Sequence, residues 1–123
     1  MTAQHRILLV DDDPSILRLA QFCLEARGLT VILAEDGSRA LDLLRDEDFD
    51  LVVLDLMLPG KNGFEVLAIL RSSQRNAEVP VYILSARASD EVREQAEAAG
   101  ANGYIRKPFD PEGLADTVVQ AIT

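Results

Sequence analysis

Short apolar runs alternate along this chain with longer stretches that carry helical spacing, and this alternation constrains the fold more than any other feature. The runs include RILLV at 6–10, TVILA at 30–34 and FDLVVL at 49–54. The third is too continuously apolar for a strand with one solvated face. Strands that alternate with helices join as parallel units, so the sequence predicts an α/β domain with helices on both faces of a parallel sheet.

Capping and turn residues divide the chain into five expected strands and five expected helices. Two further strands are expected within 79–86 and 103–107. Asp13 is positioned to cap the first helix, and Ser89 is positioned to cap the fourth. Glycine is typical just past a helix end, so we expect these two helices to end at Gly28 and Gly100. The other helices are expected at 36–45, from Phe64 onward, and from Pro111 onward.

The length and apolar content fit one compact domain over residues 1–123. A chain of 123 residues with 48% hydrophobic residues buries roughly two-thirds of its unfolded surface. The formal charge of −9 disfavours a direct nucleic-acid surface, which needs clustered Lys and Arg, and favours cations or basic partners.

The same composition indicates a soluble, cytoplasmic protein without membrane contact. The apolar runs all fall short of the roughly 18 residues that a membrane helix needs, and MTAQHR leads directly into a short strand rather than a signal-peptide core. The single Cys23 cannot close a disulfide within the chain, and its apolar helical setting predicts a small core residue.

Acidic residues gather where the predicted strands end. Asp11, Asp12 and Asp13 follow the first strand, and Asp55 ends the third. Two carboxylates ~4 Å apart repel by ~1 kcal/mol in water and ~4 kcal/mol at a protein-like effective dielectric. Ligands of parallel α/β sheets bind at this edge, so we expect a neutralising partner there.

The residues at this edge suit phosphoryl chemistry. A carboxylate such as Asp55 can attack phosphorus, but carboxylate and phosphoryl donor are both anionic. A hard divalent ion such as Mg²⁺, held by Asp11 and Asp12, would cancel that charge. Ser85 and Lys107 end the fourth and fifth strands and can donate to phosphoryl oxygens.

Four motifs in this order resemble the receiver domains of two-component response regulators, including the single-domain chemotaxis type. They are LLVDDD, VVLDLMLPGKNGFEVL, YILSA and GYIRKPF, with 30 residues from Asp55 to Ser85 and 22 from Ser85 to Lys107. The resemblance spans essentially the whole chain. It implies a flavodoxin-like fold of five βα units with strand order 2-1-3-4-5.

The resemblance also implies a metal site and its partners. Asp55 would be the phosphoryl acceptor, and Asp12, Asp55 and the backbone carbonyl of Met57 would bind Mg²⁺, with Mn²⁺ as a substitute. Asp11 would act through metal-bound water. The donor would be a phosphohistidine on a sensor histidine kinase or phosphotransfer protein, so the domain would catalyse only its own phosphorylation and dephosphorylation.

Further positions match the phosphoryl-binding and switch residues of that family. Lys107 would pair with the phosphoryl group, and Ser85 would move toward it. Tyr104 matches an aromatic that turns inward and reshapes the surface of the fourth helix, fifth strand and fifth helix. The Lys107–Pro108 bond matches one that is typically cis in the family, against a base rate of about 5–6% for X-Pro bonds.

This chain also departs from the usual family pattern. Ser85 stands where Thr is commoner, which keeps the hydroxyl and loses a methyl group. Met57 and Arg87 each lie two residues past a site residue and can line the approach to the phosphoryl group. We hypothesise that they set its lifetime.

Several other interpretations remain open on the sequence alone. Asp13 before Pro14 is expected to be only a helix cap. An aspartyl phosphatase of the haloacid dehalogenase group would want an Asp at position 57, where this chain has Met. A scaffold that binds partners without phosphorylation is a third alternative. For Tyr104, ordinary packing of an edge-strand aromatic competes with the switch role.

The output of the domain also stays open. The LMLPG wording is common in receivers attached to winged-helix DNA-binding domains, many of which dimerise through charge pairs on their fourth and fifth helices. Here residues 109–123 contain no Lys or Arg, which disfavours that dimer. The chain is either a stand-alone receiver that docks on a protein target or the receiver of a larger response regulator with an attached output domain.

Overall fold

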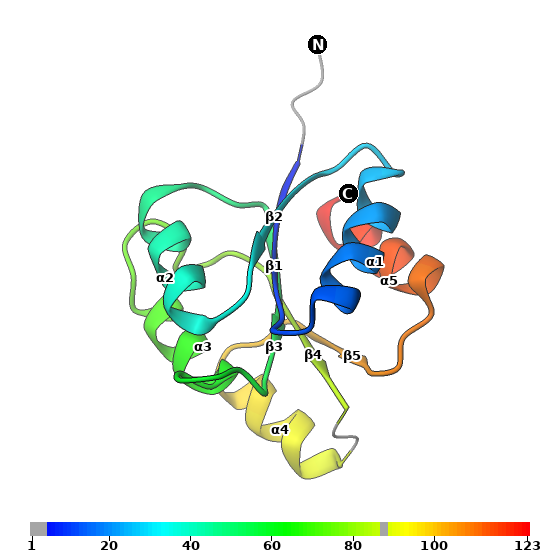
Figure 1. Cartoon of the computed structure of the whole chain (residues 1–123). Helices are drawn as coiled ribbons and strands as arrows, with labels where there is room; N and C mark the ends of the chain where they lie inside the picture. The colour runs from blue at the N-terminus through cyan, green and yellow to red at the C-terminus, as the bar shows by residue number, and fades with distance from the viewer. Residues whose placement is uncertain (1–4, 87–88) are drawn as a thin grey trace.

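A computed structural model of the protein describes residues 5–86 and 89–123. Five parallel strands form one sheet in the order β2-β1-β3-β4-β5, which confirms the expected order (Figure 1). The strands are β1 (Arg6–Val10), β2 (Thr30–Ala34), β3 (Leu51–Asp55), β4 (Val81–Ser85) and β5 (Gly103–Arg106). The helices are α1 (Pro14–Glu25), α2 (Gly37–Asp46), α3 (Gly63–Arg71), α4 (Asp90–Ala98) and α5 (Pro111–Ile122).

The sheet is covered on both faces, as the alternation predicts. Figure 1 shows α1 and α5 together on one side of the sheet, with α2, α3 and α4 on the other. All five residues of the central strand β3 are buried, because both of its faces meet helices. Two hydrophobic clusters result, one on each face.

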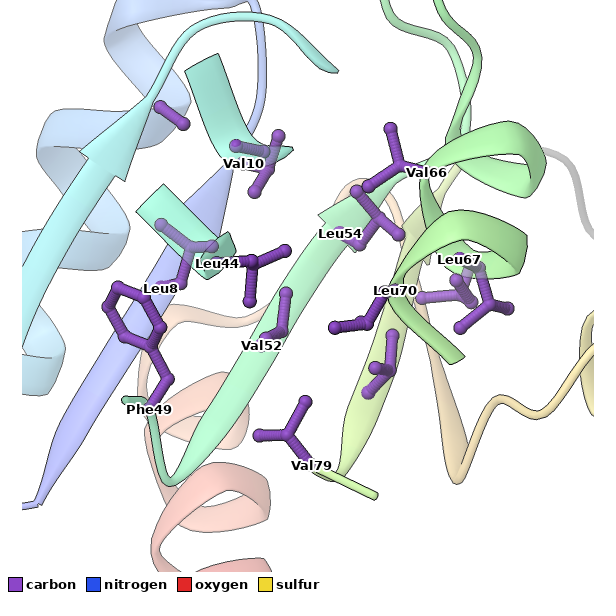
Figure 2. Close-up of a cluster of buried hydrophobic side chains, with 14 of the residues drawn as sticks. Leu8, Val10, Leu44, Phe49, Val52, Leu54, Val66, Leu67, Leu70 and Val79 are labelled. Carbon is purple, nitrogen blue, oxygen red and sulfur yellow. The ribbon is translucent and has the colours of Figure 1, made fainter. Parts of the chain in front are cut away.

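The larger cluster fills the space between the sheet and the α2–α3 layer. Figure 2 shows Leu8 and Val10 of β1 and Val52 and Leu54 of β3 facing side chains of α2 and α3. The opposite cluster contains Cys23 of α1, which is 6% exposed and unpaired, as predicted. Burial of β1, β3 and β4 fixes their positions along the strand axis, and therefore the positions of the residues at their carboxyl ends.

Helix ends follow the predicted caps with small shifts in the boundaries. The Asp13 carboxylate accepts a hydrogen bond from the backbone N–H of Ser15, and the Ser89 hydroxyl caps α4 through Val92. The helices α1 and α4 end at Glu25 and Ala98, slightly before the glycines that were expected to end them. Gly28 and Gly100 instead adopt φ values of 83° and 107° in the turns that follow, a conformation that glycine accepts without a steric penalty.

Strand register places the functional edge. Leu54 of β3 pairs with Ile83 of β4, and Asp55 pairs with Leu84. Ser85 pairs in turn with Arg106, so Lys107 follows directly at the same edge.

Within the described residues, no helix is long and apolar enough to span a membrane.

Candidate functional site

The end of β1 presents two carboxylates in different surroundings. The backbone N–H of Asp11 donates to the carbonyl oxygen of Ala34 at 3.1 Å, which extends the pairing with β2 by one residue. The Asp11 side chain is fully buried, and its Oδ1 accepts from the backbone N–H of Asp13 at 2.9 Å. Asp12 is exposed. Asp13 is occupied in capping α1, as predicted.

Asp55 ends β3 and is 2% exposed. Its Oδ1 accepts a hydrogen bond from the backbone N–H of Met57 at 3.0 Å, which fixes the orientation of the carboxylate. The loop then returns so that the N–H of Gly63 donates to the carbonyl oxygen of Leu56 at 3.0 Å. The start of α3 is therefore packed directly behind the end of β3.

Lys107 directly follows the edge strand β5, and its side chain reaches these carboxylates. Its Nζ lies 2.7 Å from Asp11 Oδ2 and 3.1 Å from Asp55 Oδ2, and its side chain is 17% exposed. Its backbone N–H donates to the carbonyl oxygen of Ser85 at 2.8 Å. The Lys107–Pro108 peptide bond is cis, as the resemblance implied.

Burial and charge shift the pKa values of both ionised partners. Burial raises the pKa of Asp55 and the Asp11 carboxylate adds to it, while the Met57 N–H and Lys107 act in the opposite direction without cancelling the rise. For Lys107, burial alone would lower the pKa, but hydrogen bonding and attraction to Asp11 and Asp55 outweigh it, and the pKa lies above its ordinary value. The site therefore favours the charged form of Lys107 and the protonated form of Asp55, relative to the same groups in water.

The donor set fits a hard divalent cation. Asp11, Asp12 and Asp55 each offer an oxygen, and these oxygens lie within 4.8 Å of one another. Three carboxylates and one ammonium leave a formal charge of −2, which one divalent ion would cancel. Asp11 Oδ2 is buried, and apart from Lys107 Nζ at 2.7 Å it has no polar partner within the described residues. A buried carboxylate oxygen with a lone pair that accepts from no donor is suited to a metal ion or its water.

The two expected switch residues lie farther out along the sheet. Ser85 ends β4 and is fully buried. Tyr104 on β5 is half-buried, and its hydroxyl oxygen is enclosed without a hydrogen-bond partner among the described residues. The guanidinium of Arg93, from α4, lies 5.6 Å from the centre of the Tyr104 ring. Tyr104 therefore links β5 to α4, as both its packing role and its switch role require.

The two residues expected to set phosphoryl lifetime have different outcomes. Met57 is 58% exposed, and its backbone N–H contacts Asp55. Arg87 lies outside the described residues.

Gly63 lies directly behind Asp55, and nothing in the sequence motifs singled it out. A Cβ at this position would lie 2.5 Å from the carbonyl oxygen of Asp55 and 2.7 Å from the Cα of Leu56, distances that real Cβ atoms do not show. Its place directly after Asn62, which caps α3 through Glu65, is the signal that could have identified it.

Comparison with known proteins identifies the family to which the chain belongs. The family model for the response regulator receiver domain matches residues 7–119. The chain belongs to this family. Receiver domains are the phosphoryl-accepting modules of two-component signalling, and the strand order of this sheet is the one that the resemblance implied. The haloacid dehalogenase alternative is thereby set aside.

Individual relatives support the same assignment. The transcriptional regulatory protein CpxR of Escherichia coli K12 is 44% identical over 110 residues, which are 89% of this chain and 46% of CpxR. The chain thus spans about half the length of such curated relatives. The chemotaxis response regulator CheY4 of Vibrio cholerae superposes with a TM-score of 0.92 at 31% identity, covering 97% of this chain and 99% of CheY4.

A third relative was solved with a metal. The receiver domain of the sensor histidine kinase PA1611 from Pseudomonas aeruginosa superposes with a TM-score of 0.88 at 30% identity, covering 98% of each chain. That structure has a magnesium ion coordinated in its active-site cleft.

Proposed function

We propose that Asp55 is the phosphoryl acceptor of this receiver domain. The observation that carries the proposal is the contact of Lys107 Nζ with Asp55 Oδ2 at 3.1 Å, inside a group of three carboxylates. Of these three, Asp11 is fully buried and already held by Asp13 and Lys107. Asp12 is exposed in the loop that follows β1, whereas Asp55 ends the central strand β3 and is buried.

The reaction transfers a phosphoryl group from a phosphohistidine of a sensor histidine kinase or a phosphotransfer protein. A bond forms between an Asp55 carboxylate oxygen and phosphorus, the nitrogen–phosphorus bond of the donor breaks, and the leaving imidazole takes a proton. Little covalent work is left to the protein beyond positioning and charge stabilisation. The Met57 N–H holds Asp55 Oδ1 in one orientation at 3.0 Å, which reduces the motion the attacking group must lose.

Asp12, Asp55 and the backbone carbonyl of Met57 would hold Mg²⁺ or its substitute Mn²⁺, and Asp11 would bind through metal-bound water. When bound, the ion neutralises the charge that separates a carboxylate from an incoming phosphoryl group. The formal charge of −2 in the site supports this ligand set, and so does the lone pair of Asp11 Oδ2 that accepts from no donor among the described residues. So does the magnesium ion in the related PA1611 receiver.

Lys107 and Ser85 would bind the transferred group. Lys107 reaches Asp55 from the segment that follows β5, and its raised pKa keeps it charged at neutral pH. Ser85 ends the neighbouring strand β4 in register with Arg106, one residue before Lys107. An ammonium and a hydroxyl on one side of the acceptor can share the charge of the phosphoryl oxygens.

Phosphorylation would change the surface formed by α4, β5 and α5. Among the helices of the described chain, α4 is the most weakly anchored, since Ala96 is its only buried residue. Tyr104 connects β5 to α4 through Arg93, and its buried hydroxyl has no hydrogen-bond partner among the described residues. Shifting this surface from 1:99 to 99:1 would take about 5.5 kcal/mol of differential interaction. Contacts of the phosphoryl group with Lys107 and Ser85 would supply part of it.

Met57 and Arg87 would set the lifetime of the acyl phosphate. Met57 adjoins the acceptor and is 58% exposed, so its apolar side chain can obstruct an attacking water. Arg87 would bind phosphoryl oxygens through its guanidinium. The domain would then act as a timed switch that catalyses only its own phosphorylation and dephosphorylation.

The output would be a cytoplasmic protein target or an attached output domain, without direct nucleic-acid or membrane contact by the receiver. The name of CpxR as a transcriptional regulator supports an attached output domain. In this chain the α5 acids Glu112 and Asp116 are paired with Arg27, in the turn that follows α1, at 3.0 Å and 2.7 Å. Internal pairing of these acids supports the expectation against a dimer held by charge pairs between α4 and α5.

Intact-mass spectrometry after incubation with acetyl phosphate tests the proposal. The protein is expected to gain one phosphoryl group with Mg²⁺ and none with a chelator, and Asp55→Asn is expected to gain none. Asp42→Asn on the exposed side of α2 is the matched control and should behave as wild type. If neither wild type nor Asp42→Asn gains mass or binds beryllofluoride, the domain is a scaffold instead.

A further inference from the structure

Met57 is the one methionine in the described part of the chain, and it stands at the mouth of the acceptor site. The protein has two methionines, Met1 and Met57. The Met57 side chain is 58% exposed, and its backbone N–H donates to Asp55 Oδ1 at 3.0 Å. Its unbranched side chain has three rotatable bonds, so the thioether can turn toward a group bound at the Asp55 carboxylate two residues away.

We propose that Met57 is a redox-sensitive modification site that controls the lifetime of the phosphoryl group, an inference that rests on the proposed role of Asp55. The oxidant is a peroxide. The thioether sulfur attacks a peroxide oxygen, the oxygen–oxygen bond breaks, and the transferred oxygen passes its proton to the leaving hydroxide. The sulfur is oxidised by two electrons to a sulfoxide, and the peroxide is reduced to water.

Exposure and burial make the reaction selective for this residue within the described chain. The other sulfur there belongs to Cys23, which is 6% exposed in the core under α1. A thiol buried in the core is poorly accessible to a dissolved oxidant and is chemically inert. The Met57 thioether needs no ionisation, and the residue that carries it is 58% exposed.

Oxidation changes the Met57 side chain beside the acyl phosphate from apolar to polar. A thioether is apolar and repels an attacking water, whereas a sulfoxide oxygen is a strong hydrogen-bond acceptor that can hold one. One additional hydrogen bond to the attacking water corresponds to an acceleration of about two- to tenfold. Oxidised protein should therefore lose its phosphoryl group faster, and reduction of the sulfoxide should restore the slower rate.

The test compares autodephosphorylation before and after peroxide treatment. The wild type is treated with hydrogen peroxide, and peptide mapping locates and quantifies the added oxygen. Both forms are then phosphorylated with acetyl phosphate and Mg²⁺, and the decay of the phosphorylated mass is followed. Methionine sulfoxide reductases for both epimers should return the rate to its starting value.

Met57→Leu is the control, because leucine has similar volume and no oxidisable sulfur. Whatever its own decay rate, that rate should not change after peroxide treatment. The inference is overturned if oxidised wild type decays at the rate of the reduced form, or if Met57→Leu responds to peroxide as the wild type does. If untreated wild type takes no phosphoryl group, the proposed function fails and the inference fails with it.

Discussion

Asp55 and Lys107 are separated by 52 residues, yet Lys107 Nζ lies 3.1 Å from Asp55 Oδ2. Asp55 ends the central strand, and Lys107 follows the edge strand two positions away in the sheet. Strand β4 lies between them, so only the long lysine side chain can close the gap. The strand order of the parallel sheet thus places these two charged side chains in contact at one edge.

Removing the Lys107 charge should destabilise the fold when no metal is bound. Lys107→Met leaves the fully buried Asp11 carboxylate beside Asp55 without its ammonium. Loss of one partner from a buried ion pair costs on the order of 3 kcal/mol. Urea unfolding in the presence of a chelator measures this loss. Arg106→Met, at the exposed neighbouring position, is the control and should change stability little.

Asp55→Asn should stabilise the metal-free domain at neutral pH. Burial raises the Asp55 pKa, so between its ordinary and its raised pKa the native state binds more protons than the unfolded state. Its contribution to stability therefore falls as pH rises through that interval. Asparagine does not titrate, so the advantage of the variant should grow with pH and then level off. Chelator-treated samples unfolded in urea from pH 3.5 to 7 would show it, and an advantage that shrinks with pH would contradict it.

Much of this site follows from the sequence, but its contacts do not. The alternation of apolar runs and helical stretches predicts a parallel sheet, and the edge rule then collects Asp11, Asp55 and Lys107. The strand order came from the resemblance, because alternation alone is compatible with several orders. Nothing local shows that Lys107 contacts Asp11 even more closely than Asp55, since that distance depends on the packing of both layers.

The need for glycine at position 63 was missed for a similar reason. Steric exclusion by the Asp55 carbonyl oxygen arises only after α3 docks behind β3. Residue spacing carries no information on that approach. The helical residues stop two to three positions before Gly100 and Gly28, because each glycine closes the turn that follows the last helical residue at positive φ.

Gly63→Ala should destabilise the domain and slow its phosphorylation. The new Cβ would meet backbone atoms of Asp55 and Leu56, which cannot rotate away, so the start of α3 or the end of β3 must shift. Overpacking of this kind costs about 1–3 kcal/mol. Gly113→Ala in α5 is the control, because its Cβ would come no nearer than 3.3 Å to any atom, the nearest being a side-chain oxygen of Asp110 rather than backbone, and it should be neutral or stabilising. Equal effects of the two variants would contradict the account.

Mg²⁺ should raise the unfolding temperature of the wild type more than that of Asp12→Asn. A ligand at about 100 times its Kd stabilises by ~2.7 kcal/mol. Asp12 is exposed and contributes little to packing, so its replacement removes a metal ligand without disturbing the core. Thermal unfolding at constant ionic strength separates binding from screening. Identical shifts in the two proteins would remove Asp12 from the ligand set.

Met57→Asn should change the rate of autodephosphorylation. The substitution exchanges an exposed apolar side chain beside Asp55 for an amide that can bind water. The decay of the phosphorylated mass after removal of the phosphodonor measures the rate. Ile69→Asn, on the exposed side of α3, provides a matched polar substitution and should decay as wild type. An unchanged rate in Met57→Asn would refute its role in lifetime.

The most direct test of the central claim is to locate the phosphoryl group by chemistry. The protein is phosphorylated with acetyl phosphate and Mg²⁺, reduced with borohydride, digested and sequenced by mass spectrometry. Borohydride converts an aspartyl phosphate to homoserine and leaves free carboxylates unchanged. The account predicts homoserine at position 55 alone. Homoserine at position 11 or 12, or at none of the three, would contradict it.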